Sequence, residues 1–174
     1  MAGRKTPPAS PTLAGLDYEW KPDGNNEWYT PPSIFEALGV RFDLDPCSPP
    51  RGTGIVPADR FLSIEDDGLS TPWHGRVWLN PPYGSPAPWV EKLAFHGDGI
   101  ALLPVDTSTD VWHKHVVTAD AMCFLKGRLK FIKATRREGG GWTARFPVGL
   151  FGWGPECAEA VLSCGLGWMV DQRL

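Results

Sequence analysis

Cysteine is scarce in this chain of 174 residues, and its four cysteines stand far apart. They are Cys47, Cys123, Cys157 and Cys164. No Cys-x-x-Cys pair occurs, and the two histidines that flank Lys114 have no cysteine or carboxylate cluster beside them at a zinc-like spacing. The pattern predicts buried free thiols and no metal site.

Long apolar runs are also missing. No stretch is long enough to cross a bilayer, and residues 1–10 lack the apolar centre of a signal peptide. These absences predict a cytoplasmic protein that has no membrane partner.

An excess of one charge is missing as well, since the formal net charge is −3. This value excludes a wholly basic nucleic-acid binder, but the charges are unevenly distributed. Residues 115–150 carry seven basic and two acidic residues, whereas residues 59–70 carry four acidic residues and one arginine. A basic segment on an acidic body is typical of a protein that binds a polyanion at one face, although a solvated surface loop can have the same composition.

Glycine and proline, in contrast, are abundant, with 20 and 18 residues. Residues 1–26 contain several of both and show no apolar periodicity, so we expect a flexible N-terminal arm there. The remaining residues, 27–174, are enough for one domain with a sizeable core.

Short apolar runs that alternate with helix signals predict an α/β fold. A first helix is expected over 31–38, with Thr30 as its N-cap and Gly39 just past its end. Further strands are expected at 40–44, 58–63, 76–79, 100–105 and 121–125. Further helices are expected from the lead-in Ser85-Pro86-Ala87-Pro88 to about His96, and over 111–117. Such alternation indicates a mostly parallel sheet with helices on its faces.

The last part of the chain departs from this alternation. A β-hairpin is expected to join 121–125 to 128–133 through a turn at Lys126-Gly127. A glycine-rich loop over 134–143, a strand over 146–153 and a helix over 155–163 follow. We therefore expect the sheet to end in an antiparallel C-terminal strand pair.

One motif stands directly after the predicted strand 76–79, namely Asn80-Pro81-Pro82-Tyr83. The prolines stop the strand and remove two N–H donors, which leaves backbone carbonyls as acceptors. With the amide oxygen of Asn80 and the ring of Tyr83, these groups suit a planar substrate that carries an NH2 group. The alternative is a proline-rich turn without a function.

Two other polar clusters follow predicted strands, Asp45-Pro46-Cys47-Ser48 and residues 106–110. Ligands of open α/β sheets bind at the carboxyl ends of the strands. We therefore expect the three clusters to lie at one edge of the sheet and to form one site.

An ordered series of motifs resembles the phage-type Dam DNA N6-adenine methyltransferases. The series comprises Glu27-Trp-Tyr-Thr-Pro31, Phe42-Asp-Leu-Asp-Pro-Cys47, Asp67-Gly-Leu69 with Pro72-Trp73, Trp78-Leu-Asn-Pro-Pro-Tyr83, Leu103-Pro104 and Gly127-Arg-Leu-Lys-Phe131. The resemblance implies a Rossmann-like, S-adenosylmethionine-dependent methyltransferase domain over 27–174. The glycine-rich turn that many methyltransferases have after the first strand is absent, and Asp45-Pro46-Cys47-Ser48 stands in its place.

The resemblance also implies a set of cofactor-binding residues. They are Tyr29, Thr30, Pro31, Asp45, Pro46, Asp66 and Asp67. Thr30 and Pro31 would contact the methionine end of the cofactor, and Asp45 would bind its amino group. Asp66 or Asp67 would bind the cofactor adenine, and Asp59 or Glu65 its ribose.

The implied catalytic residues are Asn80, Pro81, Pro82 and Tyr83. The Asn80 oxygen and the Pro81 carbonyl would each accept one N6–H bond of a flipped adenine, and Tyr83 would stack on that base. Methyl transfer would be direct. Cytosine-C5 methyltransferases use a cysteine after a proline as a nucleophile, but the later strand carries Asn-Pro-Pro-Tyr, which argues against that role for Cys47.

The basic segment is expected to contact DNA. The residues predicted to do so are Arg128, Lys130, Lys133, Arg136, Arg137 and Trp142. The same chemistry can act on cytosine N4, an RNA adenine or a protein glutamine, and a non-catalytic DNA-binding module of the same fold is a further alternative. The sequence does not distinguish a monomer from a homodimer.

Overall fold

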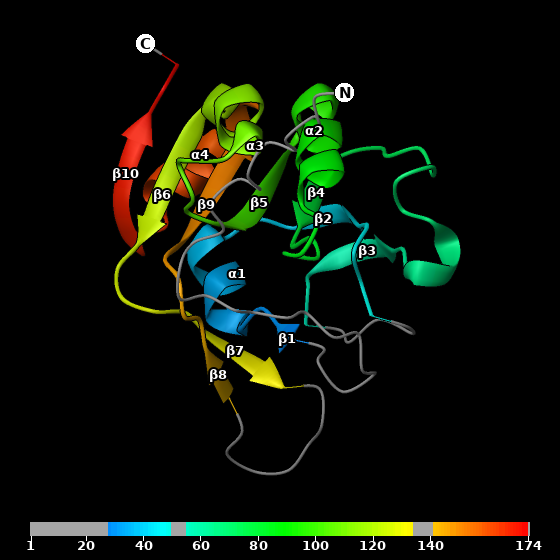
Figure 1. Ribbon diagram of the computed structural model, residues 1–174, viewed down its shortest axis with the longest axis horizontal. Helices are drawn as coiled ribbons and strands as arrows, with labels where there is room; N and C mark the ends of the chain where they lie inside the picture. The colour runs from blue at the N-terminus through cyan, green and yellow to red at the C-terminus, as the bar shows by residue number, and fades with distance from the viewer. Residues whose placement is uncertain (1–27, 50–54, 134–140, 174) are drawn as a thin grey trace, which may run out of the picture.

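The computed structural model describes residues 28–49, 55–133 and 141–173, so the predicted arm over 1–26 lies outside the described residues. A seven-stranded sheet forms its centre, in the order β10-β6-β9-β5-β4-β2-β3 (Figure 1). The strands are β2 (Phe42–Asp45), β3 (Ala58–Phe61), β4 (Val77–Leu79), β5 (Gly99–Pro104), β6 (Ala121–Leu125), β9 (Val148–Trp153) and β10 (Gly167–Asp171). The chain is an α/β protein.

The sheet is mixed rather than mostly parallel, which corrects the expectation from the sequence. Its first four strands, β2 to β5, pair in parallel. β9 pairs antiparallel with both β5 and β6, and β10 pairs antiparallel with β6. Antiparallel strands near the C-terminus are therefore confirmed, but β9 inserts into the middle of the sheet, and periodicity within a strand does not indicate which neighbours it takes.

The predicted hairpin between 121–125 and 128–133 is wrong. β9 and β10 occupy both edges of β6, so no edge is left for the segment that follows it. At Gly127, which has φ +83°, the chain turns out of the large sheet and enters β7 (Lys130–Lys133). β7 belongs to a small sheet with β1 (Trp28–Tyr29) and β8 (Gly141–Thr143), in the order β1-β7-β8.

This small sheet lies next to the carboxyl end of β6, below the large sheet in Figure 1. β8 also corrects the predicted loop over 134–143, because its last three residues form a strand. Residues 134–140 of that loop lie outside the described residues.

Helices cover both faces of the large sheet. α1 (Pro32–Leu38) and α4 (Pro155–Ser163) pack on one face, and α2 (Ala87–His96) and α3 (Asp110–Lys114) pack on the other. Two short 3-10 helices, η1 (Ile64–Asp66) and η2 (Val116–Thr118), complete the connections. Alternate residues of β4 point to opposite faces, since Trp78 belongs to the first buried cluster and Val77 and Leu79 to the second.

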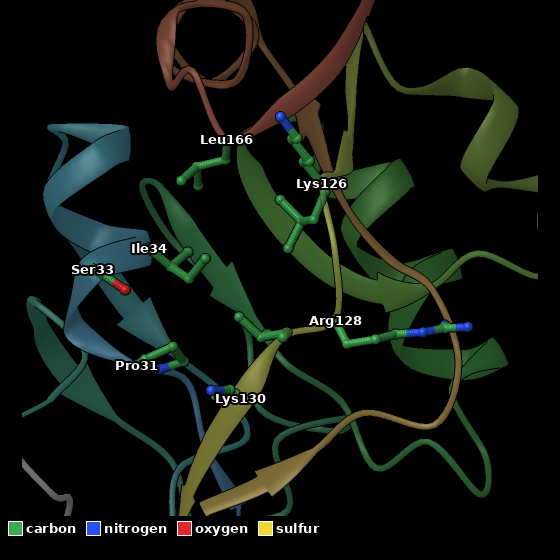
Figure 2. Close-up of a pocket in the computed structure, with 9 residues that line it drawn as sticks. Pro31, Ser33, Ile34, Lys126, Arg128, Lys130 and Leu166 are labelled. Atoms are coloured by element: carbon green, nitrogen blue, oxygen red, sulfur yellow. The ribbon is translucent and has the colours of Figure 1, made fainter.

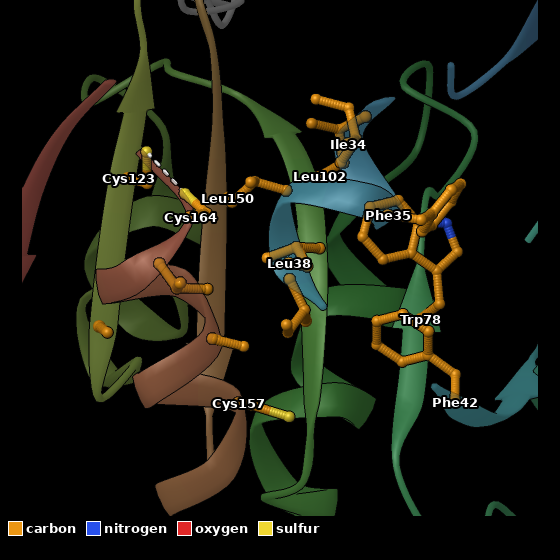
Figure 3. Close-up of a cluster of buried hydrophobic side chains, with 14 of the residues drawn as sticks. Ile34, Phe35, Leu38, Phe42, Trp78, Leu102, Cys123, Leu150, Cys157 and Cys164 are labelled. Atoms are coloured by element: carbon orange, nitrogen blue, oxygen red, sulfur yellow. Dashed lines mark hydrogen bonds between the residues drawn. The ribbon is translucent and has the colours of Figure 1, made fainter. Parts of the chain in front are cut away.

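An aromatic cluster seats α1 against the sheet (Figure 3). The ring of Phe35 in α1 lies 4.7 Å from that of Trp78 in β4, and Trp78 lies 5.5 Å from Phe42 in β2. All three side chains are buried. Because Trp78 precedes Asn80 by two residues, this packing also places the start of α1 near the carboxyl end of β4.

The predicted N-cap of α1 is wrong by one residue. Pro31 occupies the N-cap position with extended backbone angles (φ −65°, ψ 144°), and the helix begins at Pro32. A residue that precedes proline is kept out of the helical region, so both Thr30 and Pro31 must stay extended. Thr30 is instead buried, with 3% of its surface exposed, and Gly39 ends the helix as expected with φ 65°.

Three cysteines are buried free thiols as predicted, namely Cys123, Cys157 and Cys164. The sulfur atoms of Cys123 and Cys164 lie 3.7 Å apart, and Figure 3 shows this contact between β6 and the end of α4. Cys47 is only partly buried. Within the described residues, no helix has the length and apolar character that a membrane span requires.

Candidate active site

The carboxyl ends of β2 and β4 flank the point where the strand order of the sheet reverses. From β2 the chain moves outward to β3 and then returns to β4 on the other side of β2. Open α/β sheets bind their ligands at such reversals. The groups directly after these two strands, Asp45-Pro46-Cys47 and Asn80-Pro81-Pro82-Tyr83, are therefore the first candidates for a site.

The end of β4 carries hydrogen-bond acceptors that no described residue satisfies. The Asn80 amide has no hydrogen-bond partner among the described residues, and its side chain is partly exposed. The Pro81 carbonyl likewise has no partner in the described part of the chain, whereas the exposed Pro82 accepts a bond of 3.1 Å from the Ser85 N–H. The arrangement offers two acceptors to a ligand that carries two N–H donors.

The side chain of Tyr83 is held by its surroundings. Its ring lies edge-on to Phe146 at 5.6 Å and to Phe131 of β7 at 6.4 Å. Its hydroxyl donates to the Leu102 carbonyl of β5 at 3.4 Å, and burial raises its pKa above the ordinary range. Tyr83 therefore joins the motif to the small sheet, and its stacking on a base stays a prediction.

Asp45 is a buried carboxylate at the end of β2. Only 3% of its surface is exposed, and Oδ1 accepts one bond of 3.1 Å from the Cys47 N–H. Burial raises the pKa of Asp45 from 3.8 to about 7, because one backbone donor does not replace the lost hydration. A positively charged group bound beside Asp45 would restore its charged form.

Cys47 is a poor nucleophile in this position. Burial raises the pKa of its thiol well above the usual value, and the adjacent Asp45 raises it further. Covalent catalysis requires the thiolate. The raised pKa argues against a nucleophilic role for Cys47, and the absence of that role stays a prediction.

An acidic turn follows β3 at the same edge of the sheet. Asp66 Oδ2 accepts bonds from both the backbone and the hydroxyl of Ser63, at 2.8 and 2.9 Å, in a capping box around η1. Asp67 adopts a left-handed conformation with φ 46° and accepts a bond from the Ser70 N–H. These bonds lower the pKa of both carboxyls, which stay charged and exposed.

Lys92 of α2 holds the backbone of residues 68–71, which directly follow the acidic turn at Asp66 and Asp67. Its ammonium donates to the carbonyls of Gly68, Leu69 and Thr71 at 3.1, 2.6 and 2.6 Å, and it lies 4.7 Å from the centre of the Trp73 ring. Gly68 packs so closely that a methyl group there would lie 2.5 Å from the Pro46 carbonyl. The acidic turn is thus held against the end of β2.

Lys92 was not predicted from the sequence, because a lysine in an amphipathic helix gives no signal of what it binds. The exposed Trp168 in β10 was not identified from the sequence either. It is 70% exposed and stacks on Phe124 at 5.6 Å.

The cluster at 106–110 lies at the carboxyl end of β5, at the predicted edge, but its groups bond to one another. Asp106 Oδ1 accepts the Ser108 hydroxyl at 2.6 Å, and the Thr109 hydroxyl caps α3. This cluster shapes the start of α3. Asp59, a candidate for the ribose, lies near the amino end of β3 and pairs with Arg41 at 2.7 Å, which leaves Glu65 at the correct edge.

The residues predicted to bind DNA are only partly described. Arg128 and Lys130 are exposed at the entry to β7. Lys133 lies in β7 and Trp142 in β8, but the positions of their side chains are not described, and Arg136 and Arg137 lie outside the described residues. β1 pairs with β7, so Tyr29 lies next to Ile132 in this basic region.

No group of three or more histidine, cysteine or acidic residues in the described part of the chain could hold a metal ion.

The mixed sheet and the polar groups at its switch point are consistent with a methyltransferase fold. A family model described as DNA N-6-adenine-methyltransferase (Dam) matches residues 20–143. The chain therefore belongs to the Dam DNA N-6-adenine-methyltransferase family.

A curated relative agrees with this assignment. The DNA N-6-adenine-methyltransferase of Haemophilus phage HP1 (strain HP1c1) is 30% identical over an alignment that covers 60% of this chain and 65% of the phage protein. The chain thus spans just under two thirds of the length of that relative. No solved structure gives a significant match.

Proposed function

We propose that this protein transfers a methyl group from S-adenosylmethionine to the N6 amine of adenine in DNA, by direct transfer to a base held by Asn80-Pro81-Pro82-Tyr83. One observation carries the proposal. Acceptors that no described residue satisfies, at the end of β4, and a buried acid at the end of β2 flank the same switch point. Family membership supports the same chemistry.

The residues at the end of β2 fit the cofactor. Asp45 is more than nine-tenths buried, and among the described residues its carboxyl accepts a hydrogen bond from the Cys47 N–H alone. It therefore has room to bind an ammonium group such as that of a methionine. Thr30, buried at the start of α1, adds a hydroxyl, and Pro31 follows it, while Tyr29 and Pro46 lie beside these residues in the chain. Asp66, Asp67 and Glu65 offer charged or polar acceptors to the adenine and ribose.

The cofactor supplies a methyl group on a positively charged sulfur that accepts the bonding electron pair as the methyl leaves. The protein must make the adenine amine nucleophilic, because the N6 lone pair is delocalised into the ring. Asn80 and Pro81 would each accept one N6–H bond, which favours a tetrahedral nitrogen whose lone pair points away from both acceptors. After the transfer the methylated nitrogen is positively charged, and it becomes the neutral product by losing one of its two N–H protons to solvent. A fixed pair of acceptors costs no rearrangement during the reaction.

The target base must leave the helix to reach acceptors at the edge of a sheet. Arg128, Lys130, Lys133, Arg136 and Arg137 would bind the phosphates and Trp142 would stack, so the basic segment is the proposed DNA surface. Phe131 in the same segment contacts Tyr83, which supports a DNA surface next to the catalytic motif.

The test is to incubate the pure protein with isotope-labelled S-adenosylmethionine and separate DNA, RNA and protein acceptors, and then to analyse digests by mass spectrometry. N6-methyladenine in DNA is the expected product. Label in cytosine N4, RNA adenine or glutamine would move the acceptor to one of those groups. A protein that binds DNA but labels no acceptor would be a binding module instead.

The role of Cys47 is tested by Cys47→Ser. We expect methyl transfer within about threefold of the native rate, because a thiol whose pKa is raised this far cannot supply the thiolate that covalent catalysis needs. Initial rates and circular dichroism are measured on both proteins. Complete loss of transfer in a folded Cys47→Ser protein that still binds cofactor would revive the covalent mechanism.

The role of Lys92 is tested by Lys92→Ala, with Lys114→Ala as the control on the adjacent helix. Three carbonyls lose their shared donor, so we expect faster hydrogen exchange over 66–72 and cofactor binding weaker by about 10-fold. Exchange elsewhere should not change. Native-like exchange over 66–72 in Lys92→Ala would show that Lys92 does not position this turn.

A further inference from the structure

A pocket of about 300 Å³ lies between the start of α1 and the segment that leads from β6 into β7 (Figure 2). This volume is at the lower end of the range for ligand pockets, so it suits a group about the size of one nucleotide. Neither the catalytic motif nor the acidic turn lines it. Pro31 of the proposed cofactor site and Arg128 and Lys130 of the proposed DNA surface do line it, so the pocket lies where these two regions meet.

The lining combines an apolar wall with positive charges. Ile34, Leu125, Leu129 and Leu166 supply the apolar surface. Lys126, Arg128 and Lys130 supply the charge, and none of the lining residues is acidic. In Figure 2, Lys126 and Lys130 lie toward opposite ends of the group of side chains, whereas Arg128 extends away from α1.

The backbone of this segment is held at two points. Lys126 N–H donates to the Leu166 carbonyl at 2.9 Å, and the Leu129 carbonyl accepts from the Ala144 N–H at 2.9 Å. Because the chain bends at Lys126 and Gly127, Lys126 and Lys130 lie closer together than the roughly 13 Å that four extended residues would span. Two positive groups at this separation can bind two successive charges of a chain rather than a single ion.

The pocket is also close to the catalytic motif. Phe131 directly follows Lys130, is almost fully buried, and contacts the ring of Tyr83. Because alternate residues of a strand point to opposite sides, Lys130 and Phe131 turn toward the pocket and the motif respectively. A DNA strand with one base at Asn80 therefore has its adjoining nucleotides within reach of the pocket.

We propose that this pocket binds a nucleotide next to the methylated base, with its base or sugar on the apolar wall and its two flanking phosphates on Lys126 and Lys130. The inference rests on the proposed function, since extruding one base leaves its neighbours unstacked. An apolar centre between two positive ends matches a nucleotide within a strand. The pocket would then contribute to the choice of the neighbouring base.

The first test compares two double variants that each remove two positive charges. Lys126→Ala with Lys130→Ala alters the pocket, and Arg41→Ala with Lys114→Ala removes exposed charges that pair with Asp59 and Asp110 elsewhere. DNA binding is measured by fluorescence anisotropy over a range of salt concentrations, without a methyl donor. The pocket variant should bind about 10- to 100-fold more weakly, with a salt slope smaller by about 2, because each lost phosphate contact lowers the slope by about 0.9.

The second test changes the charge inside the pocket at constant size. Ser33 lines the pocket and is exposed, so Ser33→Glu and Ser33→Gln should both fold. Ser33→Glu should weaken DNA binding by about 10-fold relative to Ser33→Gln, because only the carboxylate repels a phosphate. Cofactor affinity is measured on both and should be equal.

Equal salt slopes for the two double variants, or equal DNA affinities for the two Ser33 variants, would refute the pocket proposal even if the protein methylates DNA. Pocket-dependent binding without methylation of any DNA would keep the pocket as a nucleotide-binding site, but would refute the proposed reaction and the placement of that nucleotide beside a methylated base.

Discussion

Replacing Asn80 by alanine is expected to reduce methyl transfer by about 100- to 1,000-fold, while the affinity for S-adenosylmethionine stays within about twofold of the native value. No described residue bonds to the amide of Asn80, and in the proposed reaction its loss would leave the adenine N6 with the Pro81 carbonyl alone. The proposed cofactor residues lie elsewhere, after β2 and β3 and in the segment from β1 to the start of α1. Single-turnover rates and calorimetric titration measure the two quantities separately.

Asn80→Asp is the matched control, because it keeps the size of the side chain and an acceptor oxygen. It should retain more activity than Asn80→Ala. If Asn80→Ala instead loses cofactor binding, Asn80 belongs to the cofactor site. If Asn80→Ala and Asn80→Asp are equally slow, acceptance of an N6–H bond is not the role of this residue.

Replacing Asp45 by asparagine is expected to stabilise the protein and to abolish cofactor binding. A carboxyl whose pKa rises from 3.8 to about 7 on folding costs stability once the pH passes above its unfolded-state pKa. The cost grows between about pH 4 and pH 7 and has an upper bound of about 4 kcal/mol above that range. Asp45→Asn removes it and keeps an oxygen for the Cys47 N–H.

Thermal unfolding at several pH values measures this effect. The Tm of Asp45→Asn should exceed that of the native protein by several degrees at pH 8, at about 2–4 °C for each kcal/mol, and should match it near pH 4. A Tm difference that does not change with pH would contradict the raised pKa of Asp45.

Cofactor binding by Asp45→Asn should weaken by about 100-fold or more, because a buried ammonium would lose its charged partner. In the native protein, a bound cation lowers the pKa of Asp45, so cofactor affinity should be constant above pH 7 and fall about tenfold for each pH unit below it. Calorimetry over pH 5 to 8 checks this. Flat affinity in the native protein would remove Asp45 from the amino-group site.

Several elements were predictable because their signals are local. Ala121–Leu125 and Pro155–Ser163 form a strand and a helix over the predicted ranges, since an apolar run and a proline-led first turn depend only on nearby residues. The location of the site was predictable for the same reason. Prolines stop β4 and follow β2, so the polar residues after Leu79 and at Asp45 must lie at strand ends.

Other features depend on distant residues and could not be predicted. Three strands, β7, β9 and β10, compete for the two edges of β6, and the outcome of this competition sets its neighbours. All six residues of β9 are buried, so β9 is the strand best suited to a central position in the sheet. β10 was missed because it begins with Gly167 and exposes Trp168. The predicted N-cap of α1 was wrong because a residue before a proline is kept out of the helical conformation, and this restriction outweighs the capping preference of Thr30.

The central position of β9 has a consequence for the order in which the protein folds during synthesis. The match to the family model ends at residue 143 of this chain, whereas β9 begins at Val148 and separates β5 from β6. Until β9 has emerged from the ribosome, one edge of β5 has no strand paired with it. β6 then has no neighbouring strand in the large sheet, because β10 emerges later than β9. A nascent chain at that stage exposes an apolar strand edge that promotes aggregation, so a fragment that ends at 143 should be insoluble although it contains the proposed catalytic motif.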